Sequence, residues 1–196
     1  MRYAIGGYHV HRMRLFTGID LPKDVKERLD VLISHLRTTA HVKWSPAYNL
    51  HITTKFIGEW PTEGLPELTA ALREVSVDSP VKIQVRGLGW FPNPHSPRVF
   101  WAGVSASPSL KQLAEATDAA TVAVGAQKED RPFSPHLTLA RIKQPAPLDG
   151  LRRAIAELES VDFGSFAAEC FYLYLSEPGP SGSIYTPLHE FPLPRA

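Results

Sequence analysis

The chain has 196 residues, which is enough for one large domain or two small lobes. Its hydrophobic fraction of 43% and charged fraction of 21% are those of an ordinary soluble globular protein. The formal net charge of +1 argues against a protein that wraps long nucleic acid, which usually carries a strong basic excess, but it permits recognition of one phosphate at a nucleic-acid end.

In chain order, the hydrophobic pattern of the first half predicts a strand, a helix, a short strand, a strand, a helix and a strand. These elements cover residues 13–19, 22–36, 41–44, 50–58, 61–75 and 81–88. The first helix is marked by Pro22 at its start and by apolar residues that recur at helical spacing from Val25 to Leu36. A loop rich in Gly, Pro and Asn is expected over residues 89–97.

The second half repeats this order, with strands expected over residues 98–104, 135–142, 166–175 and 184–193. Helices are expected over residues 109–124 and 148–159. Frequent prolines in the last strand suit the edge of a sheet. Each half therefore reads strand, helix, strand, helix, strand, which predicts an α+β fold of two lobes that pack antiparallel sheets around a shared central cleft.

The tripeptide His-x-Thr occurs twice, at matching places in an internal duplication. His51-Ile52-Thr53 and His136-Leu137-Thr138 are 85 positions apart, and other landmarks repeat at 84 to 86 positions. The repeated landmarks are residues 14–18 with 98–102, residues 61–65 with 147–151, and the apolar runs that start near Val81 and Ala167. The sequence thus predicts a pseudo-symmetric site in which two histidines face each other.

Both tripeptides lie in predicted strands, where residues i and i+2 point to the same face. His51 therefore shares a face with Thr53, and His136 with Thr138, while the residue between them points into the core. With an ordinary pKa of about 6.5, a neutral histidine can take a proton from water and a protonated one can donate a proton to a leaving oxygen. Each threonine hydroxyl can donate to a non-bridging phosphate oxygen.

A structural interpretation of the motifs stands beside this one. A histidine next to a threonine in a strand can be a structural hydrogen-bonding pair, and one His-x-Thr in a chain of this composition means little. Two copies at matching positions favour chemistry. No cluster of Asp, Glu and His with ligand spacing accompanies either motif, so we expect catalysis without a metal or another cofactor.

Three stretches resemble the two-histidine (2H) phosphoesterase superfamily: RLFTGIDLP at residues 14–22, VKWSP followed by NLHITTKFIGE at residues 42–59, and RPFSPHLTLAR at residues 131–141. The branch they resemble most is that of the bacterial and archaeal RNA 2′,3′-cyclic phosphodiesterases, also called LigT-like proteins or 2′-5′ RNA ligases. The resemblance runs from about residue 13 to the C-terminus. The chain departs from the family at Thr54, which is commonly Leu, with little effect expected because Thr54 points away from the site.

The resemblance implies a bilobal, pseudo-two-fold fold with two antiparallel sheets flanked by helices. It implies one bilobal domain over residues 13–196, each lobe carrying one motif, and an N-terminal extension over residues 1–12. It also implies that His51 is the proton donor and His136 the proton acceptor, a distinction that spacing alone does not make. The implied reaction is metal-independent hydrolysis of RNA 2′,3′-cyclic phosphate ends to 2′-phosphates.

Two residues of the second motif region carry open alternatives. Arg141 is commonly Arg in the family, which implies a contact to phosphate, whereas its strand parity differs from that of His136 and favours a surface salt bridge unless the strand bends. Phe133 can stack on a base, but anchoring of the loop to the core is the stronger expectation.

Other aromatic and basic residues are expected to be structural. Trp44 and Trp101 are assigned to the core. Lys55 shares the face of the first motif by parity, but a solvated strand end is the preferred interpretation. Cys170 is the single cysteine and is also assigned to the core, and because it cannot form an internal disulfide we expect a reducing cytoplasm.

Three functions remain open on the sequence. The leading one is an enzyme that acts on RNA ends or nucleotides with a 2′,3′-cyclic phosphate. The second is an enzyme that cleaves or forms 2′-5′ phosphodiester bonds in RNA or oligonucleotides with the same histidines. The third is a nucleotide-binding module without turnover. No segment approaches the roughly 18 apolar residues of a membrane span, so we expect no membrane partner, and we expect a monomer.

Overall fold

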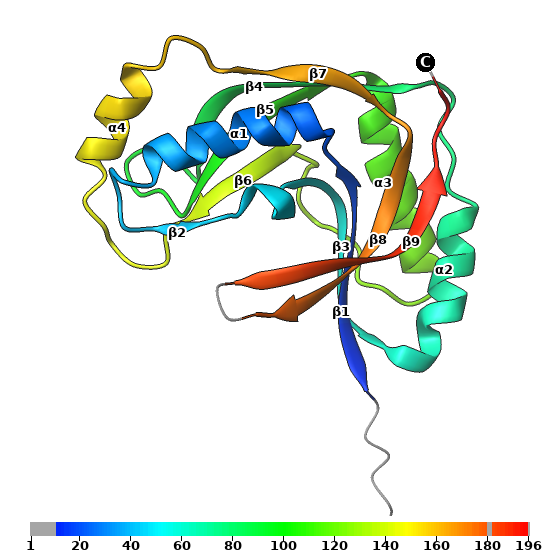
Figure 1. The fold of residues 1–196 in the computed structure, drawn as a ribbon. Helices are drawn as coiled ribbons and strands as arrows, with labels where there is room; N and C mark the ends of the chain where they lie inside the picture. Colours follow the sequence, from blue (N-terminus) through cyan, green and yellow to red (C-terminus); the bar gives the residue numbers. More distant parts are fainter. Residues whose placement is uncertain (1–10, 180–181, 196) are drawn as a thin grey trace, which may run out of the picture.

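The structure, a computed structural model, describes residues 11–179 and 182–195. Within these residues the chain forms two antiparallel β-sheets with α-helices packed against them (Figure 1). Of the expected N-terminal extension, residues 1–10 lie outside the described residues, and the first strand begins at Arg12. None of the helices in the described ranges is long and apolar enough to span a bilayer.

The first sheet has four strands in the order β3–β1–β8–β9, and each neighbouring pair is antiparallel. Its strands are β1 (Arg12–Asp20), β3 (His51–Pro61), β8 (Cys170–Pro178) and β9 (Ser183–Pro192). The second sheet has five strands in the order β2–β6–β5–β4–β7, again antiparallel throughout. Its strands are β2 (Lys43–Trp44), β4 (Val81–Phe91), β5 (Val99–Ala106), β6 (His136–Arg141) and β7 (Asp162–Ala168).

Each sheet takes strands from both halves of the sequence. β4 comes from the first half and pairs with β5 in the second sheet, while β8 comes from the second half and pairs with β1 in the first sheet. The strands β1 and β5 are therefore flanked in the same way, by the motif strand of their own half and by a strand of the other half. The predicted fold class is confirmed, but the two sheets do not correspond to the two halves of the chain.

Two of the helices, α1 (Lys23–Leu36) and α3 (Pro108–Ala123), pack against the sheet that does not contain the strand preceding them (Figure 1). The other helices are α2 (Leu65–Arg73) and α4 (Asp149–Ala156), with the 3-10 helices η1 (Ala47–Asn49) and η2 (Thr62–Gly64). α1 follows β1 but contacts β7 of the second sheet, where Arg28 Nη1 donates to the Phe163 carbonyl at 3.0 Å. α3 follows β5 but contacts β3 of the first sheet. Because of these crossings, one hydrophobic core cluster serves both sheets.

Most predicted elements lie within a few residues of their expected bounds, and β9 forms a sheet edge as its prolines indicated. Two expectations are wrong. β4 continues to Phe91, into residues that their Gly and Pro content had assigned to a loop. The apolar run expected as one strand is two strands, β7 and β8, separated at Glu169 where the chain passes from the second sheet to the first. Both strands bury apolar residues, so the hydrophobic pattern does not mark this crossing.

Candidate active site

The two His-x-Thr tripeptides open two strands that contact each other. His51 is the first residue of β3, and His136 is the first residue of β6. The segment before β3 ties the strands together, since Trp44 of β2 pairs with Ala140 of β6 and η1 then leads into β3. The fold thus brings the two motifs, 85 positions apart in the sequence, to one place.

Both imidazoles are held by the backbone in the same way. His51 Nδ1 lies 2.8 Å from the Asn49 carbonyl oxygen, and His136 Nδ1 lies 2.8 Å from the Ser134 carbonyl oxygen. A carbonyl oxygen only accepts, so Nδ1 carries the proton in each ring and Nε2 is the nitrogen left for chemistry. The sequence does not signal these bonds, although in both motifs the accepting carbonyl stands two residues before its histidine.

The residues next to each histidine follow the predicted alternation. Ile52 and Leu137 are fully buried, whereas Thr53 and Thr138 are half-buried and share the less buried face with the histidines. Each histidine is therefore accompanied by a threonine hydroxyl on its own face of the strand. Behind the first motif, the Thr54 hydroxyl bonds the buried Thr17 hydroxyl at 2.7 Å, which confirms that Thr54 points away from the site.

A β-bulge follows each tripeptide at the same position. In the first sheet Gly18 pairs with Thr53 and Thr17 pairs with Lys55, so Thr54 is an extra residue. In the second sheet Trp101 pairs with Thr138 and the preceding Phe100 pairs with Ala140, so Leu139 is an extra residue. An extra residue interrupts the two-residue alternation of side chains, so predictions of face made from parity fail beyond each bulge.

The bulge in β6 determines the face of the strand on which Arg141 lies. Ala140 is fully buried beside the buried Leu139, and Arg141 is exposed, so Arg141 returns to the face of His136 and Thr138. Its positive charge acts to lower the pKa of both motif histidines. The strand β6 therefore bends, which is the condition under which Arg141 was expected to reach a phosphate.

The bulge in β3 overturns the interpretation of Lys55. Lys55 is only 4% exposed and lies on the opposite face from the first motif, next to the buried Thr54. Its ammonium pairs with the Asp118 carboxylate of α3 at 2.5 Å and donates to the Gln127 carbonyl at 2.5 Å. Lys55 is therefore a buried ionic tether and not a solvated strand end.

Aromatic rings that the sequence did not indicate enclose His51. Phe16 stacks on its imidazole with ring centroids 4.6 Å apart, and Tyr185 meets it edge-on at 5.0 Å. Beside this ring, a Cβ at Gly18 would lie 2.8 Å from the Ile52 carbonyl oxygen, so the close approach of β1 to β3 here favours glycine. The ring of His51 is therefore packed between Phe16 and Tyr185.

The surroundings of His136 are also aromatic. Phe91 meets the imidazole edge-on with centroids 5.0 Å apart and lies 5.1 Å from Trp101. Trp101 pairs with Thr138 and thus shares its face, so the expectation that Trp101 belongs to the core is wrong. Trp44 and Phe133, in contrast, pack against the core cluster as expected.

Burial dominates the protonation of both histidines. It lowers the pKa of His51 from 6.5 to about 4, although the Asn49 carbonyl and the Asp20 carboxylate act to raise it. Burial also lowers the pKa of His136, against the raising effect of the Ser134 carbonyl. Both imidazoles are therefore mainly neutral at pH 7.

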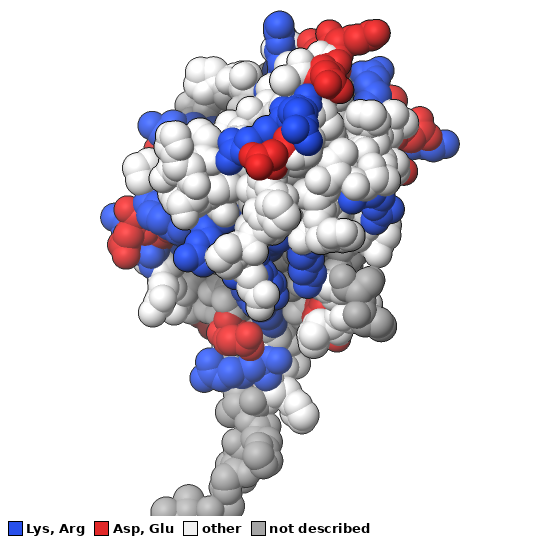
Figure 2. Space-filling model, turned by 90° about the vertical axis from the view of Figure 1, so that its left-hand side faces the viewer, with Lys and Arg blue, Asp and Glu red and all other residues white. Residues whose placement is uncertain are grey.

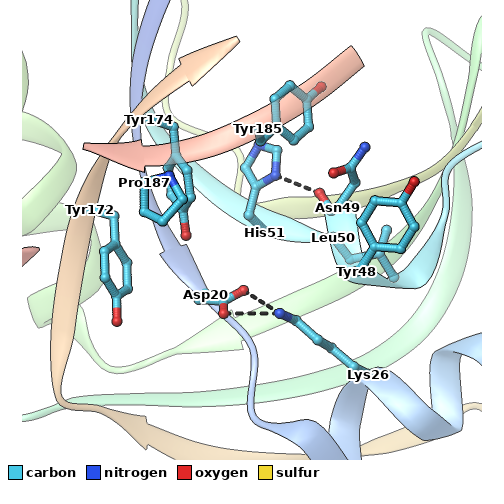
Figure 3. A pocket seen from close by; sticks show the side chains of 10 residues that line it. All are labelled: Asp20, Lys26, Tyr48, Asn49, Leu50, His51, Tyr172, Tyr174, Tyr185 and Pro187. Carbon is cyan, nitrogen blue, oxygen red and sulfur yellow. Dashed lines mark hydrogen bonds and ion pairs between the residues drawn. The ribbon is translucent and has the colours of Figure 1, made fainter. Parts of the chain in front are cut away.

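A pocket of about 200 Å³ opens beside His51 (Figure 3). Tyr172, Tyr174 and Tyr185 line it together with the ion pair of Asp20 and Lys26, whose Nζ lies 2.6 Å from the nearer carboxylate oxygen. Its remaining lining residues are Tyr48, Asn49, Leu50 and Pro187. The first motif thus adjoins a cavity with aromatic walls and both signs of charge.

Charge is otherwise mixed over the surface. On the face drawn in Figure 2, Lys and Arg side chains are interspersed with Asp and Glu, in keeping with the net charge of +1. Within the described residues there is no group of three or more His, Cys, Asp or Glu side chains arranged to hold a metal ion.

Comparison with known proteins places these motifs in a family. The sequence model of the family described as LigT like Phosphoesterase matches residues 19–101 and again residues 103–185. The chain belongs to the LigT-like phosphoesterase family. Each of the two successive matches contains one His-x-Thr tripeptide, which confirms both the duplication and the family that the motifs resembled.

LigT-like relatives match nearly the whole chain. A protein of Archaeoglobus fulgidus named RNA 2′,3′-cyclic phosphodiesterase is 35% identical over 91% of this chain and 99% of its own length. A Thermus thermophilus protein of the same name is 37% identical over 92% of this chain and 90% of its own.

Solved LigT-like structures share the fold. One from Thermus thermophilus gives a TM-score of 0.76 at 35% identity, covering 92% of this chain and 97% of that one. E. coli LigT complexed with 3′-AMP gives a TM-score of 0.75 at 27% identity, covering 94% of this chain and 100% of that one. The bilobal arrangement around the motifs is therefore the LigT-like one.

Proposed function

We propose that this chain is an RNA 2′,3′-cyclic phosphodiesterase that opens the cyclic phosphate at an RNA end and leaves a 2′-phosphate. The observation that carries the proposal is the pair of backbone-held histidines, His51 and His136, each with a threonine on its face. They occur in a LigT-like chain whose relatives bear this enzyme name at 35% and 37% identity. These names favour an enzyme over a binding module without turnover.

In the proposed reaction, Nε2 of neutral His136 takes a proton from a water molecule whose oxygen attacks phosphorus. The bond between phosphorus and O3′ breaks, and Nε2 of protonated His51 donates its proton to that oxygen. The products are a 2′-phosphate and a free 3′-hydroxyl. The two rings have then exchanged protonation states, and proton exchange with water restores them.

The charges around the site support His51 as the donor. Asp20 acts to raise the pKa of His51, and among the described residues no carboxylate acts on His136 in this way. Burial opposes protonation more strongly at His51, so the donor role depends on the bound phosphate, whose negative charge favours the protonated ring. The bound substrate thus supplies the negative charge that keeps His51 protonated.

Three further side chains complete the proposed phosphate site. The hydroxyls of Thr53 and Thr138 donate to the non-bridging oxygens, where negative charge grows in the transition state. Arg141, on the face of the second motif, supplies a guanidinium for the same oxygens. Its positive charge also offsets the charge of the phosphate.

The test uses a defined RNA oligonucleotide that ends in a 2′,3′-cyclic phosphate. We expect the protein to convert it to a 2′-phosphate end, and to do so equally well in excess EDTA. Mapping the position of the product phosphate and supplying a 5′-hydroxyl RNA in a parallel reaction separates hydrolysis from 2′-5′ joining. A protein that leaves the cyclic end intact, or that needs a divalent ion, would contradict the proposal.

A further inference from the structure

Two basic side chains lie opposite each other at the edge of the second sheet, where β2 runs beside β6 (Figure 1). Lys43 of β2 pairs directly with Arg141 of β6, and both residues are exposed. The next pair, Trp44 with Ala140, faces the core, where Trp44 meets the buried ring of Phe100 edge-on. Because side chains alternate between the two faces of a sheet, Lys43 lies with Arg141 on the face of the second motif.

These two cations have no acidic partner that would neutralise them. Among the described residues no carboxylate forms an ion pair with Lys43 or Arg141, whereas the exposed Lys23 and Lys111 each pair with a glutamate. Residues directly opposite on neighbouring strands have Cβ atoms about 4.5–5.5 Å apart, and like charges at such positions destabilise a sheet. An anion bound between the two side chains would remove this repulsion.

The Lys43 side chain reaches toward the first sheet. A Cβ at Gly182, the residue before β9, would lie 3.5 Å from Lys43 Cε and 3.7 Å from its Nζ. The start of β9 is itself tied to the segment before the first motif, because the Asn49 side-chain amide donates to the Ser183 carbonyl at 2.6 Å. The ammonium of Lys43 therefore lies where the edge of the second sheet meets the start of β9.

Lys43 lies farther from the reacting centre than Arg141 does. The charge of Arg141 acts to lower the pKa of both motif histidines, whereas Lys43 is not among the charges that act on either of them. In the proposed function Arg141 contacts the reacting phosphate, so Lys43 is placed for the next anionic group of the substrate. In RNA that group is the phosphodiester on O5′ of the terminal ribose, one sugar away from the cyclic phosphate.

We infer that Lys43 binds the internucleotide phosphate that precedes the terminal nucleotide of the RNA. The inference rests on the proposed function and adds a contact that distinguishes an RNA end from a free nucleoside 2′,3′-cyclic monophosphate, which lacks this phosphate. Arg141 contacts the reacting phosphate and Lys43 the next one, so bound RNA neutralises both cations. Lys43 thus contributes to the affinity for an RNA end and takes no part in proton transfer.

The test compares a ribodinucleotide that ends in a 2′,3′-cyclic phosphate with the cyclic monophosphate of its terminal nucleoside. For the dinucleotide, Lys43→Gln should raise KM about 3- to 10-fold at low salt, because it removes one contact between a cation and a phosphate. The slope of log KM against log salt concentration should fall by about 0.7, the contribution of one phosphate contact to a single strand. The kcat should change little, and Lys43→Arg should keep the KM of the parent protein.

Two substrates without the internucleotide charge show whether that charge carries the effect. With the cyclic monophosphate, and with a dinucleotide joined by an uncharged methylphosphonate linkage, Lys43→Gln and the parent protein should have the same KM. Lys23→Gln is the matched control, because it removes the same charge from a side chain of α1 that is 91% exposed, and it should leave the KM for the dinucleotide unchanged.

An equal rise in KM for all three substrates, or no rise for the charged dinucleotide, would overturn the inference and leave Lys43 as a charge that protects the edge of the sheet. Turnover of the cyclic monophosphate by the parent protein is measured first. Its absence would refute the proposed function, whereas normal turnover with no effect of Lys43→Gln on the dinucleotide would refute only the phosphate contact.

Discussion

At the scale of single residues, the site depends on how two ordinary histidines are held. The Asn49 and Ser134 carbonyls fix Nδ1 as the protonated nitrogen of each ring. Both Nε2 atoms are then equivalent in connectivity, and only their surroundings distinguish them. Phe16 and Tyr185 enclose His51, while His136 has Phe91 at its edge. A symmetric pair of motifs thus carries two imidazoles in different surroundings.

Removing either imidazole should slow cleavage of a cyclic-phosphate RNA end. We expect His51→Ala and His136→Ala each to lower kcat by roughly 10²–10⁴-fold, the usual contribution of a positioned acid or base. The double variant should be much less impaired than the product of the two effects, because both groups act in one transition state. Steady-state kinetics of the four proteins measures this.

A substrate with a nitrophenyl leaving group, which needs no protonation, separates the two roles. His51→Ala should regain much of its relative activity on this substrate, and His136→Ala should not. Rescue of His136→Ala alone would reverse the assignment of donor and acceptor.

The pH dependence of the reaction should show the lowered pKa values of both histidines. The profile of kcat/KM reports the free enzyme, so its bell should have its maximum below pH 6.5, since burial lowers both pKa values from 6.5. The bell for kcat should lie at higher pH, because the bound phosphate raises the pKa of the rings. The exposed His95 serves as a control, and His95→Gln should leave both profiles unchanged. A kcat/KM maximum on the alkaline side of the kcat maximum would contradict this account.

At the scale of elements, the two bulges determine which side chains reach the site. Each follows its threonine, and each interrupts the alternation of the motif strand. In β6 the bulge brings Arg141 to the face of His136, and in β3 it sends Lys55 to the opposite face. One backbone feature, used twice, therefore yields a cationic residue at the site in one strand and a buried tether in the other.

The Lys55 tether joins the first motif strand to the loop that leads to the second motif. Asp118 accepts from Lys55 Nζ and from the Glu129 amide, which lies in that loop. Although burial raises the pKa of Asp118, these hydrogen bonds hold it below its ordinary value. The Asp118 carboxylate therefore stays charged and fixes the loop that ends at Ser134, whose carbonyl orients His136.

Breaking this pair should destabilise the protein. Lys55→Met leaves the Asp118 carboxylate without its buried partner, so we expect a loss of about 3 kcal/mol in the free energy of unfolding, measured by urea denaturation. Lys111→Met is the matched control, because the pair of Lys111 with Glu115 is largely exposed and its loss should cost less than about 0.5 kcal/mol. Equal stability of the two variants would show that the tether contributes nothing.

At the scale of the whole molecule, the duplication produces one folding unit and not two. β4 and β8 each lie in the sheet that is built around the other half, and α1 and α3 each pack across to the other sheet. Neither half can therefore cover its central strand with its own residues. We propose on this basis that the described residues form a single cooperative domain with two lobes.

Separating the halves tests this proposal. Residues 1–94 and 95–196, divided in the loop between β4 and β5, should each lack a cooperative thermal transition when expressed alone. Mixing them should restore the transition and the cyclic phosphodiesterase activity, because the exchanged strands can then pair. Full-length protein that is folded first and then cut by a protease in the same loop is the control, and it should remain folded. A cooperative transition in either half alone would show that the lobes are independent.

Local pattern and repetition in the sequence are enough to predict a large part of this protein. Strand and helix periodicity predicts most of the element order, and the spacing of the duplicated motifs predicts that His51 and His136 meet. The full burial of Ile52 and Leu137 follows from the two-residue period alone. These predictions hold in the folded protein because each feature is determined by residues close in the sequence or by the repeat itself.

Features that depend on partners distant in the sequence became visible only in the folded chain. The bulges that reorient Arg141 and Lys55 arise from pairing between strands, which changes register without leaving a mark in the hydrophobic pattern. The hydrophobic pattern also does not show where the chain passes from β7 in one sheet to β8 in the other, since both strands bury apolar residues. The pocket beside His51 forms only when β8, β9 and η1 come together, so the tyrosines that β8 and β9 contribute to it come from the opposite half of the chain.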